Sequence, residues 1–214
     1  MVSLDSLLSS FSGVLVIDAA SSRIQVGWYG EGSRPVWKSS VEDSGEAIFH
    51  CLEGLQINVR GIGAVVFCEG PGSLLGVRTV ATLIRTWQLL SQMQIFSFRS
   101  LELVALAGGE REIGVIADAR RETWHLVEVD ADGRCCAVRR VSSENLPRRL
   151  RMPEHFRTWA PLPEGVVRVP YEIASMLEGT RASPLLRPVF EPDAFAHEAS
   201  RYVTWTPQVH RAPP

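Results

Sequence analysis

Apolar residues in the first half of the chain fall into short runs and helical repeats separated by polar or glycine-containing turns. Five runs have the length and β-branched content of strands, at 14–18, 24–29, 36–40, 64–67 and 94–98. Repeats at steps of three and four predict helices over 44–55, 75–92 and 101–107. Because the first three strands are joined by short turns, we expect an antiparallel meander that leads into alternating helices and strands.

The stretch 64–92 has the pattern of a strand, a glycine turn and a helix. Gly70, Pro71 and Gly72 interrupt the strand pattern, and Ser73 occupies the position of a helix N-cap. Such a helix start leaves free backbone N–H groups, so Gly70, Gly72 and Ser73 are candidates for contact with an anion or a nucleotide. The simpler interpretation is that they turn the chain and cap the helix. The motif is neither a P-loop nor a dinucleotide-binding fingerprint.

The strand pattern restarts at 113–117 and continues into a hairpin around Asp132 and Gly133. Prolines then limit helices to short segments at 143–151 and 171–177. The last 34 residues carry six of the thirteen prolines and are expected to be extended. The predicted organisation is an N-terminal extension, a first lobe, a small and irregular second lobe and a loose tail, at 1–13, 14–112, 113–202 and 203–214.

Composition narrows the class of protein. A formal charge of −2 gives no general attraction to nucleic acids or anionic membranes. The four cysteines have neither metal-site nor disulfide-ladder spacing, as expected in a reducing compartment. The N-terminus lacks the basic region of a signal peptide. We therefore expect a cytoplasmic protein with no membrane association.

Four segments occur in the order found in one bacterial family: VLVIDAASS at 14–22, EGPGSLLGVR at 69–78, SFRSLELVALA at 97–107 and IADARRET at 116–123. Over about 14–130 the chain resembles the TsaB/YeaZ family, the non-catalytic partner in bacterial tRNA threonylcarbamoyladenosine synthesis. The resemblance implies an α/β fold of the actin-like and Hsp70-like (ASKHA) type, made of two ribonuclease-H-like lobes. Ala19-Ala20, Leu74-Leu75 and Thr79-Val80 depart from the usual family residues, which marks a divergent member.

Catalytic relatives in this superfamily bind ATP between the lobes, with acids at strand ends. Asp18 and Asp118 end the strands that open the two lobes, so the resemblance implies them as the pair for nucleotide contact. The alternative is that each carboxylate caps its own turn, and the missing hydroxyls at Ala19-Ala20 favour it. The paralogue TsaD holds a metal with two histidines four residues apart, a spacing that no histidine pair has here. We expect no catalytic residue, no metal site and no cofactor bound by this chain alone.

In the family, first-lobe helices pack against TsaD or against a second copy. The resemblance therefore implies an interface on the helices at 44–55 and 75–92, formed by Ile48, Leu52, Arg78, Thr82, Arg85 and Leu89. It implies a TsaD-like catalytic subunit, a TsaE-like ATPase and a homodimer as partners. Arginines are also abundant in 134–157, and the candidates for contact with the tRNA backbone are Arg139, Arg140, Arg148 and Arg149. A solvated, arginine-rich surface explains the same residues equally well.

The sequence therefore predicts a TsaB-like scaffold subunit that supports a TsaD-like transferase without chemistry of its own. Two alternatives stay open. One is a homodimeric interaction protein of the same fold that has left tRNA modification. The other is an ATP-binding phosphotransferase, which would need the hydroxyl groups that the strand turns lack.

Overall fold

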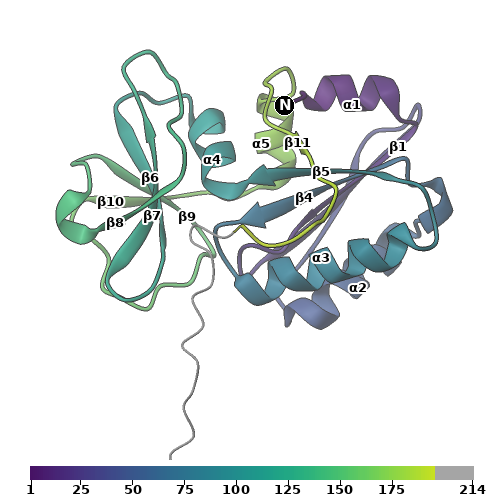
Figure 1. The fold of residues 1–214 in the computed structure, drawn as a ribbon, viewed down its shortest axis with the longest axis horizontal. Helices are drawn as coiled ribbons and strands as arrows, with labels where there is room; N and C mark the ends of the chain where they lie inside the picture. Colours follow the sequence, from purple (N-terminus) through teal and green to yellow (C-terminus); the bar gives the residue numbers. More distant parts are fainter. Residues whose placement is uncertain (196–214) are drawn as a thin grey trace, which may run out of the picture.

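The computed structural model of the chain describes residues 1–195 and contains two β-sheets with helices packed against them (Figure 1). The predicted tail at 203–214 and the last residues of the predicted second lobe, 196–202, lie outside the described residues. The α/β fold class predicted from the sequence is confirmed. In the described part of the chain, no helix has the length and apolar character needed to cross a membrane.

The first sheet has six strands in the order β11-β5-β4-β1-β2-β3. Their bounds are β1 Gly13–Asp18, β2 Ile24–Gly30, β3 Val36–Ser40, β4 Ala64–Gly70, β5 Gln94–Arg99 and β11 Arg187–Pro188. The first three form the predicted antiparallel meander, and β4 and β5 run parallel to β1. Every residue of β1 is buried, because helices cover both faces of the sheet.

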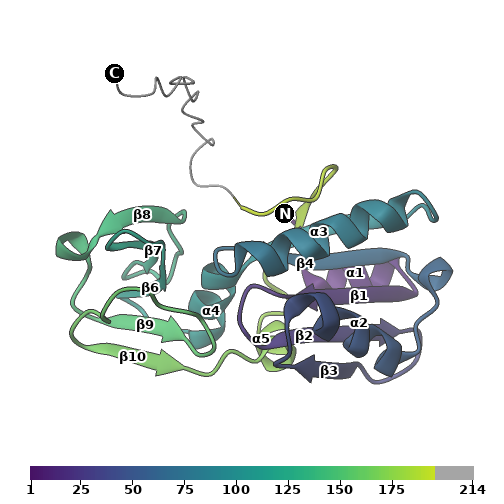
Figure 2. The ribbon, with the colours of Figure 1, turned by 90° about the horizontal axis from the view of Figure 1, so that it is seen from below.

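Alternate residues of β1 face two separate cores. Leu15 and Ile17 pack in one core with α2 Ser44–Leu55 and α3 Leu74–Gln88. Val14 and Val16 belong to the other core, which includes α1 Leu4–Ser10 and α4 Ser100–Gly108. Figure 2 shows α2 and α3 on one side of the first sheet, with α3 lying along the outside of the molecule.

The second sheet repeats the meander and then adds parallel strands. It consists of β6 Ile113–Asp118, β7 Thr123–Val129, β8 Arg139–Ser142, β9 Leu150–Pro153 and β10 Val166–Val169. Its strand order is β10-β9-β6-β7-β8, with β6, β7 and β8 antiparallel and β9 parallel to β6. The strand that opens each half of the chain therefore lies inside its own sheet, between an antiparallel and a parallel neighbour.

Residues 170–195 leave the second sheet and return to the first. α5 Ile173–Gly179 packs against α4, and β11 pairs with β5. Burial of Tyr171, Ile173 and Leu186 favours this return. Part of the predicted second lobe at 113–202 thus packs against the first sheet, so a single cut in the sequence does not separate the two sheets.

Some local elements differ from the prediction. α3 ends at Gln88 rather than at 92. The hairpin turn at Asp132-Gly133 forms and is followed by a single bridge between Val129 and Cys135, but the continuous strand β8 begins only at Arg139. The segment 143–151 contains one 3₁₀ turn, Ser143–Asn145, and the start of β9 instead of a longer helix. A further 3₁₀ turn, Val59–Gly61, precedes β4.

Candidate functional site at the two strand ends

The glycine turn packs directly on the residues that follow β1. A Cβ atom on Gly72 would lie 2.2 Å from the carbonyl oxygen of Ala20, and one on Gly76 would lie 2.2 Å from that of Ala19. The Ser73 N–H donates to the Ala20 carbonyl at 2.6 Å, and the Ser73 hydroxyl accepts from the Gly76 N–H at 3.3 Å. The predicted capping role of Ser73 is confirmed. The Ser73 N–H, which belongs to the proposed anion site, and the Gly76 N–H in the first turn of α3 therefore have acceptors within the chain. Anion contact at Gly70, Gly72 and Ser73 stays a prediction.

Asp18, at the end of β1, is fully buried. Its Oδ1 accepts the Ala20 N–H at 3.3 Å and the Tyr171 hydroxyl at 3.2 Å, while Oδ2 has no hydrogen-bond partner among the described residues. Burial raises the pKa of Asp18 to about 6, because an ionised carboxylate is poorly solvated there, although bonds to Cys68, Ala20 and Tyr171 lower it in part. Burial also raises the pKa of the Cys68 thiol and of the Tyr171 hydroxyl well above their usual values. The carboxyl group is thus enclosed by its own chain.

Asp118, at the end of β6, has both carboxylate oxygens in hydrogen bonds to backbone N–H groups. Oδ1 accepts from Arg120 at 2.6 Å, and Oδ2 accepts from Trp159 at 2.7 Å and from Ala160 at 3.1 Å. The hydrogen bonds of Asp18 and Asp118 therefore support the interpretation that each acid caps its own turn.

One segment, 155–160, connects the two strand ends, and we call it the strap. At its start, the His155 carbonyl accepts both the N–H and the hydroxyl of Ser22, at 2.8 and 2.9 Å. Its Phe156 ring packs edge-on against Tyr171, the residue that donates to Asp18. At its far end, the N–H groups of Trp159 and Ala160 donate to the Asp118 carboxylate. The strap joins the turns that follow β1 and β6, the place where the resemblance implied a nucleotide.

The C-terminal part of the described chain covers the end of β4 beside the glycine turn. The Phe195 N–H donates to the Glu69 carbonyl at 2.6 Å, and the Arg99 guanidinium lies 4.3 Å from the centre of the Phe195 ring. The Glu69 carboxylate in turn accepts from Arg99 and from Ser97, each at 2.8 Å. This network holds residues 187–195 along the edge of the first sheet.

The predicted interface residues divide between the core and the surface. Ile48 is fully buried in the core between α2 and the first sheet. The predicted interface is therefore wrong at this residue, because the packing of α2 on β2 and β3 encloses the side chain and keeps it from a partner. Leu52 is half-buried against the same core. Arg78, Thr82 and Arg85 are exposed on α3, and Leu89 is exposed at the C-cap of this helix.

The four predicted tRNA-contact arginines do not form one patch. Arg139 and Arg140 lie on β8, whereas Arg148 and Arg149 precede β9, and two strands separate β8 from β9. Three strand spacings amount to roughly 14 Å. Arg139 pairs with Glu128, and Arg149 pairs with Glu110. The predicted tRNA contact is not tested by the structure. Its four arginines are separated across the width of the second sheet.

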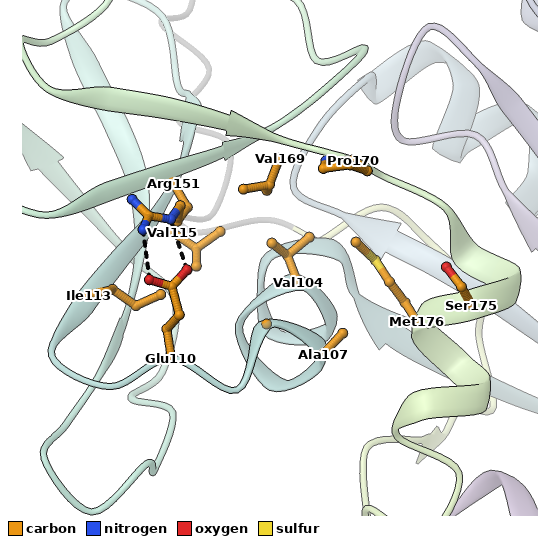
Figure 3. A pocket seen from close by; sticks show the side chains of 11 residues that line it. Val104, Ala107, Glu110, Ile113, Val115, Arg151, Val169, Pro170, Ser175 and Met176 are labelled. Atoms are coloured by element: carbon orange, nitrogen blue, oxygen red, sulfur yellow. Dashed lines mark hydrogen bonds and ion pairs between the residues drawn. The ribbon is translucent and has the colours of Figure 1, made fainter.

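A cavity of about 280 Å³ lies where α4, α5 and the second sheet meet (Figure 3). Val104, Val169 and Met176 give it a mainly apolar lining. Its charged groups bind each other, since Arg151 donates twice to Glu110, at 2.9 and 2.7 Å. The Ser175 hydroxyl donates to the Glu172 carbonyl. The polar groups that line the cavity are therefore already engaged within the chain.

Metal ligation has no counterpart in the geometry of residues 1–195, where no three His, Cys, Asp or Glu side chains converge. Of the histidines, His50 is exposed and pairs with Glu42. Sequence reasoning missed the strap, Tyr171 and Trp159. The positions of Asp18 and Asp118 at strand ends predicted turns. The neighbouring sequence did not identify their distant donors, which are Tyr171 for Asp18 and Trp159 for Asp118.

The family model described as "TsaD: tRNA N6-adenosine threonylcarbamoyltransferase" matches residues 35–139, just under half of the chain. No curated protein sequence matches significantly. The solved structure "YeaZ from Pseudomonas aeruginosa" aligns with a TM-score of 0.56 and 15% identity, covering 80% of this chain and 91% of that one. The chain has a YeaZ-like fold.

A second structure supports the same assignment. It is described as an uncharacterized protein from Pseudomonas aeruginosa with similarity to peptidase YEAZ, and it aligns with a TM-score of 0.55 and 15% identity. The alignment covers 85% of this chain and all of that one. The resemblance to the TsaB/YeaZ family found in the sequence is thus confirmed at the level of the fold, and the low identity agrees with a divergent YeaZ-like chain.

Proposed function

We propose that this chain is a TsaB-like scaffold subunit that binds a TsaD-like transferase in tRNA threonylcarbamoyladenosine modification. Three observations support the proposal: the YeaZ-like fold, the match of residues 35–139 to the TsaD family, and an exposed apolar surface on α3. The third observation carries the proposal, because it concerns a surface suited to a partner rather than shared ancestry.

The outer surface of α3 combines exposed leucines with polar groups that are already satisfied. Leu89 is 86% exposed and Leu75 is 73% exposed, far more than the helix needs for its own packing. The hydroxyls of Thr79, Thr82 and Thr86 each donate to the carbonyl four residues earlier in the helix. A partner that covers this surface would therefore desolvate few unpaired polar groups.

Charged groups border the same surface and would orient a partner. Arg78 and Arg85 are exposed on α3. Arg85 forms a long ion pair, 3.7 Å from its Nη2 to the Oδ2 of Asp193, and both side chains are more than half exposed. Solvent-exposed pairs of this kind contribute little to stability, so a partner's carboxylate competes easily for Arg85. Arginine is enriched at interface centres, and such centres are more apolar than the remaining surface, so both the leucines and the arginines are compatible with an interface.

The proposal assigns no chemistry to this chain. Its support is that Asp118 has both carboxylate oxygens in backbone hydrogen bonds and that Asp18 is enclosed beneath Tyr171. A phosphotransferase would need these acids at an open cleft. We accordingly expect Asp18→Asn to leave partner-dependent tRNA modification within about twofold of the wild-type rate. A loss of several orders of magnitude would instead favour the phosphotransferase alternative.

Two substitutions on α3 test the interface. Leu89→Asp combined with Arg85→Glu is expected to weaken binding of a TsaD-like protein by about 100-fold, since it places charge in an apolar contact and reverses an orienting charge. Isothermal titration calorimetry measures the change. The matched control combines Val167→Asp and Arg168→Glu on β10, which make the same kinds of change at an exposed valine and an exposed arginine outside α3, and it should bind normally. Equal affinities for both variants would move the interface away from α3.

The same surface would serve the homodimeric alternative. If the purified chain forms a stable dimer that the α3 variant disrupts, and a TsaD-like protein does not compete, the chain is an interaction protein with a YeaZ-like fold outside tRNA modification. The scaffold proposal includes a TsaE-like ATPase as a second partner and a cytoplasmic location, and it requires no cofactor on this chain.

A further inference from the structure

We propose that the turn Ala119–Glu122 and the end of the strap form a contact for single-stranded RNA, in which Trp159 stacks an unpaired base and surrounding arginines bind phosphates. The inference rests on the proposed function only for the identity of the RNA, which would be tRNA. Its test uses the chain alone, so it can fail without affecting the interaction with a TsaD-like protein.

Trp159 provides a rigid, exposed aromatic surface. The residue is 56% exposed, although its backbone N–H and that of Ala160 are fixed by Asp118. The Arg120 guanidinium lies 4.6 Å from the centre of the Trp159 ring. A base that stacks on a ring held in this way loses little further conformational entropy, and the adjacent guanidinium strengthens the contact.

The neighbouring turn has a strained backbone. Arg120, Arg121 and Glu122 have φ values of 64°, 52° and 58°, three successive residues in the left-handed region without a glycine among them. Conformations of this kind each cost on the order of 1 kcal/mol and are concentrated at functional sites. The turn survives because Asp118 accepts the Arg120 N–H and Arg140 donates to the carbonyls of Ala119 and Arg120.

The strained turn leaves donors available for an anion. Among residues 1–195, no backbone acceptor receives the N–H groups of Arg121 or Glu122, which follow each other on the exposed turn. Successive N–H groups on a tight turn form an anion-binding nest. Phosphate oxygens are suitable acceptors for such a nest.

Arginines lie on this turn and on the strap beside it. Arg121 and Arg157 are exposed and form no ion pair with a described residue, while Arg120 and Arg140 approach the same turn. Two carboxylates oppose them, the hydrogen-bonded Asp118 and the exposed Glu122. The local balance is positive in a chain whose formal charge is −2.

The combination of an aromatic ring, free N–H groups and unpaired arginines is better suited to a nucleic-acid strand than to a protein. Protein interfaces bury an apolar centre, whereas here a single indole lies beside the guanidinium of Arg120. Double-stranded RNA presents no unstacked base to Trp159, so a single strand or a tRNA loop is the expected ligand.

Fluorescence anisotropy with a labelled short single-stranded oligoribonucleotide tests the inference on the purified chain. Trp159→Ala is expected to weaken binding by about 10-fold or more, and Trp159→Phe should retain most of the affinity. Arg121→Gln and Arg157→Gln should each weaken binding and reduce the salt slope by about 0.7. Phe190→Ala and Arg168→Gln, which alter an exposed aromatic residue and an exposed arginine elsewhere, are the matched controls.

Three results would overturn the inference. The first is that no single-stranded RNA binds at low salt, or that the Trp159 and arginine variants bind as the controls do. The second is that ATP competes as effectively as the oligonucleotide, which would indicate a site for free nucleotides. The third is that Trp159→Ala abolishes binding of a TsaD-like protein but not of RNA, which would assign the surface to a protein partner. Preferential binding of the single strand over the same sequence in a duplex supports the inference.

Discussion

Replacing Gly76 with alanine is expected to destabilise the protein by about 2 kcal/mol, even though alanine is the better helix former. The added Cβ atom would lie 2.2 Å from the Ala19 carbonyl oxygen and 3.2 Å from the Ala19 Cβ atom. A backbone carbonyl at the end of β1 cannot rotate away, so α3 would have to shift from the sheet. This shift would break the bond between the Ser73 N–H and Ala20.

Urea denaturation of Gly76→Ala beside Gly45→Ala separates sterics from helix propensity. Gly45 lies on α2 with no atom within 4 Å of an added Cβ, so its alanine variant should be unchanged or stabilised by up to about 1 kcal/mol. If both variants are equally stable, the close contact between the glycine turn and β1 is not a determinant of the fold.

Asp18→Asn is expected to make the protein more stable than the wild type at pH 8, by about 3 kcal/mol. The pKa of Asp18 is about 6 in the folded state and near 3.8 in an exposed carboxyl group, so the folded protein holds the proton more tightly. The contribution of the protonated carboxyl to the free energy of unfolding is fully present below about pH 4 and is lost as the pH rises through about 6. Asparagine keeps the acceptor oxygen for Tyr171 and Ala20 and never ionises.

The measurement is the free energy of unfolding of both proteins between pH 4 and pH 8. Because other carboxylates titrate equally in both, the difference between the two proteins isolates Asp18. This difference should be near zero at pH 4 and grow as pH rises. An asparagine variant that is less stable by the same amount at every pH would show that the folded protein stabilises the ionised carboxylate.

Much of the fold follows from hydrophobic periodicity. β1, β4 and β6 are continuous apolar runs because both faces of each strand are buried, and α3 has its buried residues at steps of three and four. These patterns are local and strong, so their element types were predicted correctly. The glycine turn and its Ser73 cap follow for the same reason.

Other elements depend on contacts that no local pattern reveals. α1 has a serine-rich sequence, but Leu4 and Leu7 are buried and Ser3 caps the helix. β9 and β10 are four-residue parallel strands among prolines, formed because β6 offers a free edge. Ile48 and Leu52 belong to the same apolar face of α2, and only the fold shows that Ile48 is fully buried whereas Leu52 is half-buried.

The candidate site was predictable only at its two ends. Asp18 and Asp118 could be placed at strand ends, with capping as one interpretation, whereas Trp159 and Tyr171 reach them through the strap and the return of the chain to the first sheet. The segment around Trp159 contains Pro161 and Pro163 and has the composition of an ordinary loop. Its significance depends on three-dimensional proximity to the strained turn.

Size-exclusion chromatography with light scattering, applied to this chain alone and mixed with the TsaD-like protein of its own organism, tests the central claim most directly. The scaffold proposal predicts a new species whose mass equals the sum of both chains, and its loss when Leu89→Asp and Arg85→Glu are combined. Two separate peaks with unchanged masses, at concentrations well above micromolar, would contradict it.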